Sequence, residues 1–321
     1  MHLADLLSGP RRRWIYLGRP QTALLPWLAS ILLVLINPSI NMGCGRGESV
    51  PCPQWILSVE RRMPKFAANL TMLFNEVDFP DRFKLAAEHG FRGVEYLFPY
   101  AYPKEQLAEL LSRHGLIQVL HNLPAGDWAQ GERGIAILPG RRSEFQDGVG
   151  RAIEYATALG CRQVNCLAGI VPAGANPDQL RETFLANVRF ADQELKARGI
   201  KLLIEAINTY DMPGFYVSKT QQTLDLIDAA GCDNTFVQYD IYHMQRMEGE
   251  LAGTIQRHLP RIAHMQLADN PARNEPGTGE INYRYLFDLI DKIGYTGWIG
   301  CEYKPAARTS EGLGWVKPYL R

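Results

Sequence analysis

The sequence lacks a net charge, since its 321 residues contain 34 lysines and arginines and 34 aspartates and glutamates. It also has no long basic run and no interleaved row of aromatic and basic residues, so the general attraction for phosphate that supports nucleic-acid binding is missing. No GxGxxG or GxxxxGKS/T segment follows an early strand-like run, which leaves no phosphate-binding loop of known spacing. We therefore expect a small-molecule partner and no nucleic acid.

Paired cysteines are missing as well. The six cysteines include no CxxC pair, which argues against a zinc ribbon and against a disulfide framework. The main domain is therefore expected to be a reduced, cytoplasmic protein. Cys301 is expected to be a small apolar filler of the core.

The sequence has no apolar run long enough to cross a bilayer. The stretch 23–36 has about 14 residues and contains Pro26, whereas a membrane span needs roughly 18 to 20. It lies within residues 1–62, which are basic at first and later rich in turn formers. We expect 1–62 to be a non-core extension, either disordered or upstream of a true start at Met63. A secretory signal or an anchor at 23–36 is the alternative, and no stable membrane span is expected.

Residues 63–321 contain a repeated pattern. Apolar strand-like runs alternate with segments of helical period, and the alternation occurs eight times. Many helical segments end in a glycine, as expected for a left-handed residue that closes a helix: Gly90, Gly115, Gly160, Gly199 and Gly231. Eight strand and helix pairs in about 250 residues predict a single (β/α)8 TIM barrel. A doubly wound open sheet is the alternative.

Polar residues stand at the predicted strand ends, where such a barrel has its active site. The clearest case is the apolar run KLLIEAIN, which contains Glu205. A buried, unpaired carboxylate costs several kcal/mol or more, so Glu205 needs a cation or hydrogen-bond donors beside it. The other residues at strand ends are Glu95, His121, Asn122, Asn208, Asp240, His243, Gln266, Asp269 and Glu302.

Four of these residues point to a metal site. Glu205, Asp240, Gln266 and Glu302 come from four successive strands and therefore from one side of the barrel mouth. Three carboxylates cannot share a small dry site without a cation, because each raises the cost of ionising the next. An oxygen-only set without cysteine favours Mg²⁺ or Mn²⁺ over Zn²⁺. The alternative for any single acid is an ion pair with a lysine or arginine inside the barrel.

Other side chains are candidates for contacting a substrate. The turn-rich loop NEPGTGE follows the seventh strand and places Arg273 near the mouth. An arginine there can hold a carboxylate by a bidentate contact, and a surface salt bridge is the alternative. His121 and His243 are predicted to orient substrate oxygens, whereas His264 is expected to fill the barrel interior.

Five segments together resemble the xylose isomerase-like barrel superfamily, and within it the hydroxypyruvate isomerase family: LIEAIN, QYDIYHMQ, HMQLADNP, NEPGTGEINY and GCEYKP. The similarity extends from Met63 to about Pro305. It implies a metal-dependent isomerase that interconverts hydroxypyruvate and 2-hydroxy-3-oxopropanoate, a small hydroxy/oxo acid. It also implies that Glu205, Asp240, Gln266 and Glu302 hold the metal, with Glu205 and Glu302 as the acid/base pair.

Other functions remain open on the same barrel. A 2-oxo-tetronate isomerase or a ketose 3-epimerase would use the same groups on a longer substrate. An endonuclease IV-type phosphodiesterase needs a histidine-rich zinc cluster, for which the seven histidines of the chain are a poor supply. A non-catalytic sugar-acid binding protein is the alternative outside the enzymes. The sequence predicts no oligomeric state.

Overall fold

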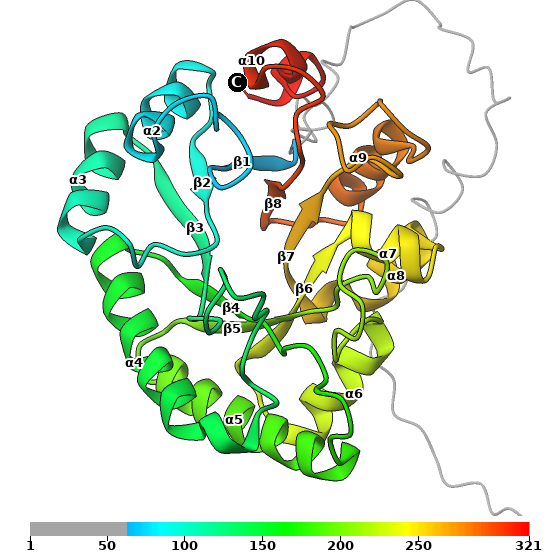
Figure 1. The fold of residues 1–321 in the computed structure, drawn as a ribbon. Helices are drawn as coiled ribbons and strands as arrows, with labels where there is room; N and C mark the ends of the chain where they lie inside the picture. The colour runs from blue at the N-terminus through cyan, green and yellow to red at the C-terminus, as the bar shows by residue number, and fades with distance from the viewer. Residues whose placement is uncertain (1–62, 321) are drawn as a thin grey trace, which may run out of the picture. The chain divides into compact units, whose positions relative to one another are not determined.

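The computed structural model describes residues 63–320, which form a closed barrel of eight parallel strands. Neighbouring strands pair in chain order, and β8 pairs back with β1, where Phe66 lies opposite Ile299. Figure 1 shows the strands at the centre of the domain and helices around the outside. The predicted (β/α)8 barrel is therefore confirmed. The predictions for residues 1–62, including the signal-like stretch, fall outside the described residues.

Each strand is followed by at least one helix. The strands are β1 (Lys65–Asn69), β2 (Gly93–Glu95), β3 (Ile117–Asn122), β4 (Gln163–Cys166), β5 (Lys201–Glu205), β6 (Thr235–Asp240), β7 (Ile262–Leu267) and β8 (Trp298–Cys301). The helices are α2 (Phe79–Glu88), α3 (Lys104–His114), α4 (Arg142–Leu159), α5 (Pro177–Lys196), α6 (Thr220–Ala230), α7 (Ile241–Met247), α8 (Leu251–His258), α9 (Tyr283–Lys292) and α10 (Thr309–Gly312). Between residues 63 and 320, no helix has the combined length and apolarity that a membrane crossing requires.

Glycine ends several of the helices, as the sequence predicts. Gly115, Gly160 and Gly231 cap α3, α4 and α6 with φ angles of 62°, 65° and 67°. This left-handed conformation is costly for residues with a Cβ atom. The chain can therefore leave each helix in one residue and turn directly into the next strand.

Alternate residues of the strands point into the barrel, because the side chains of a strand repeat with a period of two. A small apolar group fills part of this interior: Ala67, Val119, Leu120 and Leu203. Val119 and its neighbour Leu120 both belong to it, because Val119 is the extra residue where the pairing of β3 with β2 shifts register, and such a bulge interrupts the alternation. A polar group is buried there too. His264 is fully buried and bonds to Glu95 Oε2 through Nε2 at 2.7 Å, which confirms that it fills the interior.

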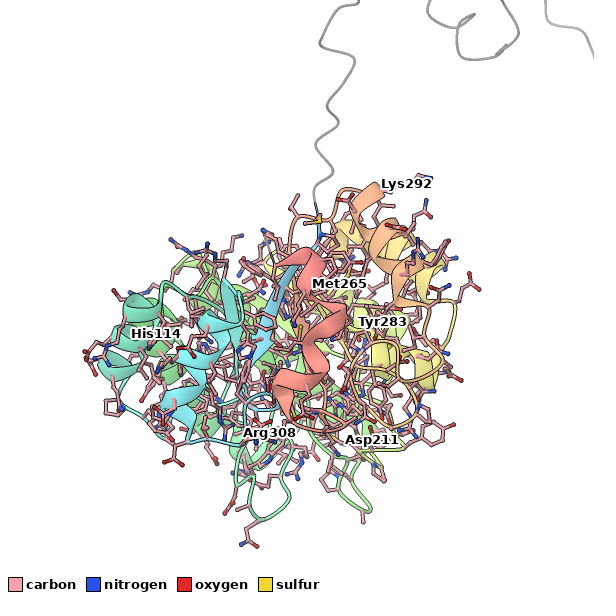
Figure 2. All side chains as sticks on the ribbon, turned by 90° about the horizontal axis from the view of Figure 1, so that it is seen from above. His114, Asp211, Met265, Tyr283, Lys292 and Arg308 are labelled. Carbon is pink, nitrogen blue, oxygen red and sulfur yellow. The ribbon has the colours of Figure 1, made fainter. Side chains whose placement is uncertain are left out.

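The loops that follow the strands collect at one end of the barrel. Figure 2 shows Asp211 and Arg308, which follow β5 and β8, at the same end of the domain. Lys292, the last residue of α9, lies at the opposite end (Figure 2). Because all strands are parallel, this arrangement brings residues from strand ends that are distant in sequence into one region.

An aromatic cluster fastens the C-terminal segment to the barrel. The ring of Phe66 in β1 lies 5.0 Å from the ring of Phe287 in α9, and 5.3 Å from the rings of Trp315 and Tyr319, measured between centroids. Phe66 is almost fully buried. The first strand thus packs on the last segment of the domain.

We expect Phe66→Ala to lower the free energy of unfolding by about 3–5 kcal/mol, because it leaves a cavity among three rings. Urea unfolding followed by circular dichroism measures the change. Ile117→Ala removes a side chain that is 54% exposed and serves as the control, with an expected change of about 0.5 kcal/mol or less. Equal effects of the two substitutions would contradict the packing described here.

Candidate active site

The four predicted metal-binding residues lie together at the end of the barrel where the loops collect. Glu205 ends β5, Asp240 ends β6, Gln266 lies in β7 and Glu302 follows β8. Asp240 pairs in register with Gln266, and Gln266 with Gly300. All four are buried. The register of adjacent strands thus brings the four side chains to one wall of the barrel mouth.

Amide side chains connect these residues. Gln266 Nε2 donates a hydrogen bond to Glu302 Oε2 at 2.6 Å. Gln238 Nε2 donates to Glu205 Oε2 at 3.0 Å and to Gln266 Oε1 at 2.6 Å. Gln238 was not among the predicted site residues. The sequence could have indicated Gln238, because it lies two residues before Asp240 and residues i and i+2 of a strand share a face.

A further carboxylate, Glu95, lies within the barrel beneath this wall. Its Oε1 accepts hydrogen bonds from Asn69 Nδ2 at 3.0 Å and from Gln266 Nε2 at 2.8 Å. Asn69 Nδ2 also lies 3.2 Å from Glu302 Oε2. A Cβ atom at Gly300 would collide with the Glu95 carboxylate, so glycine is required where β8 passes Glu95. Glu95 is therefore a structural partner of the site and does not line the cavity.

Burial and mutual repulsion change the proton affinity of the two candidate catalytic glutamates. Burial raises the pKa of Glu205 well above its ordinary value, and the nearby charges of Glu302 and Asp240 raise it further. Burial raises the pKa of Glu302 to about 8, against the opposing charge of Arg273 and with the support of Asp240 and Glu95. Both carboxyl groups can therefore bind a proton at higher pH than a carboxyl group in water.

Asp240 offers one unused oxygen to the site. Its Oδ1 caps α7 by accepting hydrogen bonds from the backbone N–H groups of Tyr242 and His243, at 2.7 and 3.2 Å. Its Oδ2 is buried and has no hydrogen-bond partner. Glu205, Asp240 and His243 each place one ligand atom within 4.8 Å of the others. A group of residues that can hold a metal is therefore present in the described part of the chain.

The hydrogen bonds of Asn208 determine the tautomer of His243. Asn208 Oδ1 accepts from the backbone N–H groups of Tyr210 and Asp211, so its Nδ2 faces His243 Nδ1, at 2.6 Å. Nδ1 must then accept, and burial lowers the pKa of His243 to about 4. The neutral ring carries its proton on Nε2, which lies 3.6 Å from Asp240 Oδ2 and 3.8 Å from Glu205 Oε1. In this tautomer, His243 donates a hydrogen bond into the site from Nε2. Nε2 can bind a metal only if the proton moves to Nδ1, which requires the Asn208 amide to turn its oxygen toward the ring.

Arg273 is the cation of the acidic wall. Its Nη2 donates to Glu302 Oε1 at 2.8 Å and lies 3.9 Å from Asp240 Oδ2. Its side chain is only 13% exposed. The guanidinium carbon lies 5.2 Å from the centroid of the Tyr242 ring. Arg273 is therefore a largely buried partner of the site acids, and the alternative of a surface salt bridge is wrong.

Asp269 organises the loop that carries Arg273. Its carboxylate accepts hydrogen bonds from the backbone N–H groups of Gly277 at 2.8 Å, Gly279 at 2.9 Å and Ile281 at 3.1 Å. Asp269 is buried and does not line the cavity described below. Its role is to fold residues 270–281 over the strand ends.

The structure does not bring His121 to the site. His121 and Asn122 are consecutive in β3, so their side chains point to opposite faces. Asn122 lines the cavity, whereas the His121 ring is fully buried with its centroid 6.1 Å from that of Tyr100. Strand alternation thus gives Asn122 the position that the sequence suggested for His121.

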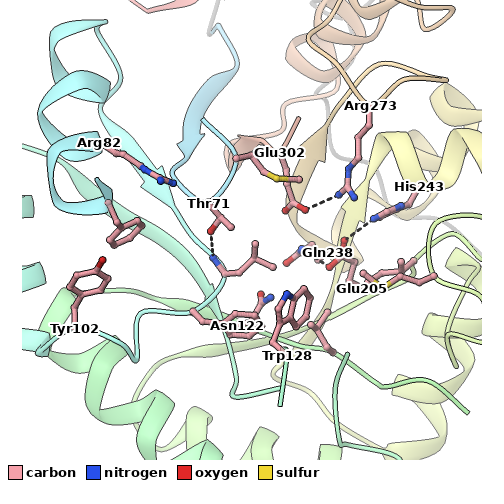
Figure 3. A pocket seen from close by; sticks show the side chains of 17 residues that line it. Thr71, Arg82, Tyr102, Asn122, Trp128, Glu205, Gln238, His243, Arg273 and Glu302 are labelled. Carbon is pink, nitrogen blue, oxygen red and sulfur yellow. Dashed lines mark hydrogen bonds and ion pairs between the residues drawn. The ribbon is translucent and has the colours of Figure 1, made fainter. Parts of the chain in front are cut away.

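A cavity of about 510 Å³ opens at this end of the barrel. Figure 3 shows Arg273 and His243 on one side, Arg82 and Tyr102 on the other, and Glu302 and Glu205 between them. Aromatic side chains supply much of the remaining wall: Phe79, Phe98, Tyr102 and Trp128. Its volume is in the usual range for small-molecule sites. The acids therefore face a pocket that combines one polar wall with one aromatic wall.

The closed barrel and the buried acids at its strand ends form a candidate site with residues of the types that hold metals or transfer protons. A family model described as "Xylose isomerase-like TIM barrel" matches residues 83–319, and the chain belongs to this family. The chain is 56% identical over 257 residues to hydroxypyruvate isomerase of Escherichia coli, which covers 80% of this chain and 100% of the relative. It is 48% identical to 2-oxo-tetronate isomerase of Cupriavidus necator, over 80% of this chain and 99% of that one. The protein is an enzyme of the isomerase class.

Solved structures agree with the fold. A crystal structure described as "AP endonuclease, family 2" from Brucella melitensis superposes with a TM-score of 0.79 at 46% identity, over 80% of this chain and 99% of that chain. A D-allulose 3-epimerase from Methylomonas sp. has a TM-score of 0.64 at 20% identity, over 78% of this chain and 90% of that chain. At such low identity, the second likeness shows the fold alone.

We expect Asp269→Ala to destabilise the protein by about 2–4 kcal/mol, because three backbone N–H groups, one of them buried, lose a charged acceptor. The loop should also become the first site of proteolysis. Limited trypsin digestion with mass spectrometry should show early cleavage after Arg273. Asp225→Ala, on the exposed face of α6, is the control. An unchanged unfolding midpoint and digestion pattern in Asp269→Ala would contradict the role assigned to this carboxylate.

His121 should make the stability of the fold depend on pH. Burial lowers the pKa of His121 to about 4, below its unfolded value of about 6.5. The unfolded chain binds the proton first, so this histidine lowers stability as pH falls from 6.5 to 4, by about 3 kcal/mol. We expect the stability of His121→Phe to fall less than that of the wild type over this range. Parallel curves from urea unfolding at several pH values would contradict the prediction.

Proposed function

We propose that this isomerase interconverts hydroxypyruvate and 2-hydroxy-3-oxopropanoate. The observation that supports this most is that Glu205 and Glu302, two buried carboxyl groups with raised pKa values, line one cavity. The similarity to hydroxypyruvate isomerase over the full length of that relative adds support. The same residues suit a reaction that moves a proton between adjacent carbons.

The proposed reaction removes a proton from C3 of hydroxypyruvate and returns a proton to C2, through an enediolate. The hydroxyl proton passes from the C3 oxygen to the C2 oxygen, so atoms and charge balance. One of Glu205 and Glu302 takes the carbon-bound proton on a carboxylate oxygen, and the other delivers a proton to the neighbouring carbon. Proton exchange with solvent then restores both groups.

We propose that a divalent metal, Mg²⁺ or Mn²⁺, is held by Glu205, Asp240, Gln266 and Glu302. The buried, unpartnered Oδ2 of Asp240 supports this assignment, as does the oxygen-rich character of the set. A bound metal would supply Lewis acidity toward the substrate oxygens. Gln266 Oε1 accepts from Gln238 in the structure, so Gln266 would have to exchange this partner to act as a ligand.

Three side chains are suited to orienting the substrate. His243 presents its Nε2 proton near Glu205 and Asp240, where it can donate to a substrate carbonyl or hydroxyl oxygen. Arg273 donates to Glu302 and so holds that carboxylate in place next to the substrate. Asn122 lines the cavity and replaces His121 as the candidate from β3. His121 is left with a packing role.

A 2-oxo-tetronate isomerase is the second candidate. The chain is 48% identical to a relative of that name, and a cavity of about 510 Å³ leaves room for a longer chain than that of hydroxypyruvate. A ketose 3-epimerase finds support only in the fold. An endonuclease with several zinc ions finds none, because Glu205, Asp240 and His243 are the only metal-type cluster among residues 63–320.

Glu205→Gln and Glu302→Gln should each lower kcat for hydroxypyruvate about 10²–10⁴-fold, because each removes one proton-transfer group. Proton NMR in D₂O measures turnover and should show solvent deuterium in the wild-type product. Glu109→Gln, on the exposed face of α3, is the control for loss of a carboxylate. Full activity of both variants would refute the proposed pair.

Removal of divalent ions should abolish turnover, and Mg²⁺ or Mn²⁺ should restore it, because the acids need a cation. Turnover after chelation and dialysis is measured with hydroxypyruvate and with a four-carbon 2-oxo acid. The ratio of the two kcat/KM values decides between the candidate substrates. Saturable binding of either acid without conversion by the metal-replete protein would favour a binding protein instead.

A further inference from the structure

The aromatic wall of the cavity contains a second arginine, Arg82, which lies in α2. Arg82 and Arg273 are the two arginines among the described residues that line the cavity. Figure 3 shows them on opposite sides of it. Arg82 was not among the predicted site residues, because it belongs to a helix and not to a strand end.

Backbone carbonyl groups hold the Arg82 side chain in place. Its Nε donates to Val77 O at 3.1 Å and its Nη1 donates to Leu70 O at 2.8 Å. Both acceptors belong to the segment between β1 and α2. These neutral partners fix the guanidinium plane without matching its charge, and they leave Nη2 without a hydrogen bond to any described residue.

Acids do not neutralise Arg82 directly. Glu76 and Asp78 are close enough to favour its charge electrostatically, but within residues 63–320 neither comes within the 4.0 Å of an ion pair with Arg82. Arg273 is in the opposite situation, since it already contacts Glu302 and lies near Asp240. The positive charge available to an incoming anion is therefore greater at Arg82.

The surroundings of Arg82 strengthen a charged contact. Phe79 and Tyr102 stack beside it with ring centroids 5.1 Å apart, and the Arg82 guanidinium carbon lies 5.8 Å from the centroid of Phe79. Aromatic walls exclude water from the space between an arginine and its ligand, which increases the electrostatic attraction. A planar guanidinium is also well suited to a planar carboxylate.

Arg82 is tied to the reacting end of the cavity through adjacent residues. Leu70, which anchors Arg82, follows Asn69, whose side-chain amide lies 3.2 Å from Glu302 Oε2. Arg82, Glu205 and Glu302 also line the same cavity, so a substrate that spans this cavity contacts Arg82 and the acids at once. In a 2-oxo acid, the carboxylate is bonded directly to the carbon that receives the proton.

We propose that Arg82 binds the carboxylate of the substrate and so makes the enzyme selective for 2-oxo acids over neutral hydroxy ketones. This inference rests on the proposed function. In this assignment, Arg273 holds the carboxylate of Glu302 beside the reacting carbons. Arg82 binds the substrate carboxylate, which does not react.

The test compares the wild type with Arg82→Gln, Arg82→Lys and Arg151→Gln. Arg151 also donates to a backbone carbonyl, Tyr100 O at 3.0 Å, but does not line the cavity, so it controls for loss of an arginine anchor. Each protein is assayed with hydroxypyruvate and with dihydroxyacetone, in which a hydroxymethyl group replaces the carboxylate. Binding of glycerate, which has no ketone or aldehyde group and cannot isomerise, is measured by calorimetry.

We expect Arg82→Gln to raise KM for hydroxypyruvate and Kd for glycerate about 10- to 100-fold. Its kcat, and the kcat/KM for dihydroxyacetone, should stay within about threefold of the wild type. Arg82→Lys should recover part of the affinity, because lysine keeps the positive charge but cannot form two parallel hydrogen bonds to a carboxylate. Arg151→Gln should match the wild type. Equal losses with the acid and the neutral ketone, or unchanged glycerate binding, would overturn the assignment. Failure of the wild type to convert any substrate would overturn the proposed function, while glycerate binding still tests Arg82.

Discussion

The site depends on two amide groups shared between two buried carboxylates. Gln266 Nε2 and Asn69 Nδ2 each lie within hydrogen-bond distance of both Glu95 and Glu302. A carboxylate buried without donors would be too costly to keep at the centre of a barrel. The amides reduce this cost on both sides, and His264 gives Glu95 a third partner. Glu302 is thereby held at the end of β8 in a position set by β1, β2 and β7.

The acidic wall brings like charges close together, and the loop after β7 carries an arginine that partly neutralises them. Asp269 binds three backbone N–H groups and folds the loop, and the folded loop brings Arg273 to Glu302. One guanidinium cannot match the charges of Glu205, Asp240 and Glu302 together. Burial first, and this remaining charge mismatch second, raise the pKa values of the two glutamates. Groups that bind protons more tightly than usual and also face a cavity are suited to proton transfer.

The two walls of the cavity differ in the residues that they present and in the roles that we propose for them. The strands β5 to β8 and the loops after them provide the charged groups that we propose to transfer protons, and the barrel fixes the positions of these groups. Helix α2, together with the loops after β2 and β3, provides Arg82 and the aromatic side chains. Selectivity can therefore change through the aromatic wall without disturbing the acids. This division fits a family in which named relatives act on acids of different length.

The sequence by itself determined the barrel, because eight alternations of strand and helix and the glycines between them leave few other folds. It also determined which acids meet, since parallel strands carry their C-terminal residues to one end. Tertiary structure alone decided the finer choices. Consecutive residues of β3 point to opposite faces, which gave the cavity Asn122 and not His121. Arg82 acquired its place through contacts with the backbone carbonyls of Val77 and Leu70, and the helical periodicity of α2 does not predict how the segment before the helix folds back onto it.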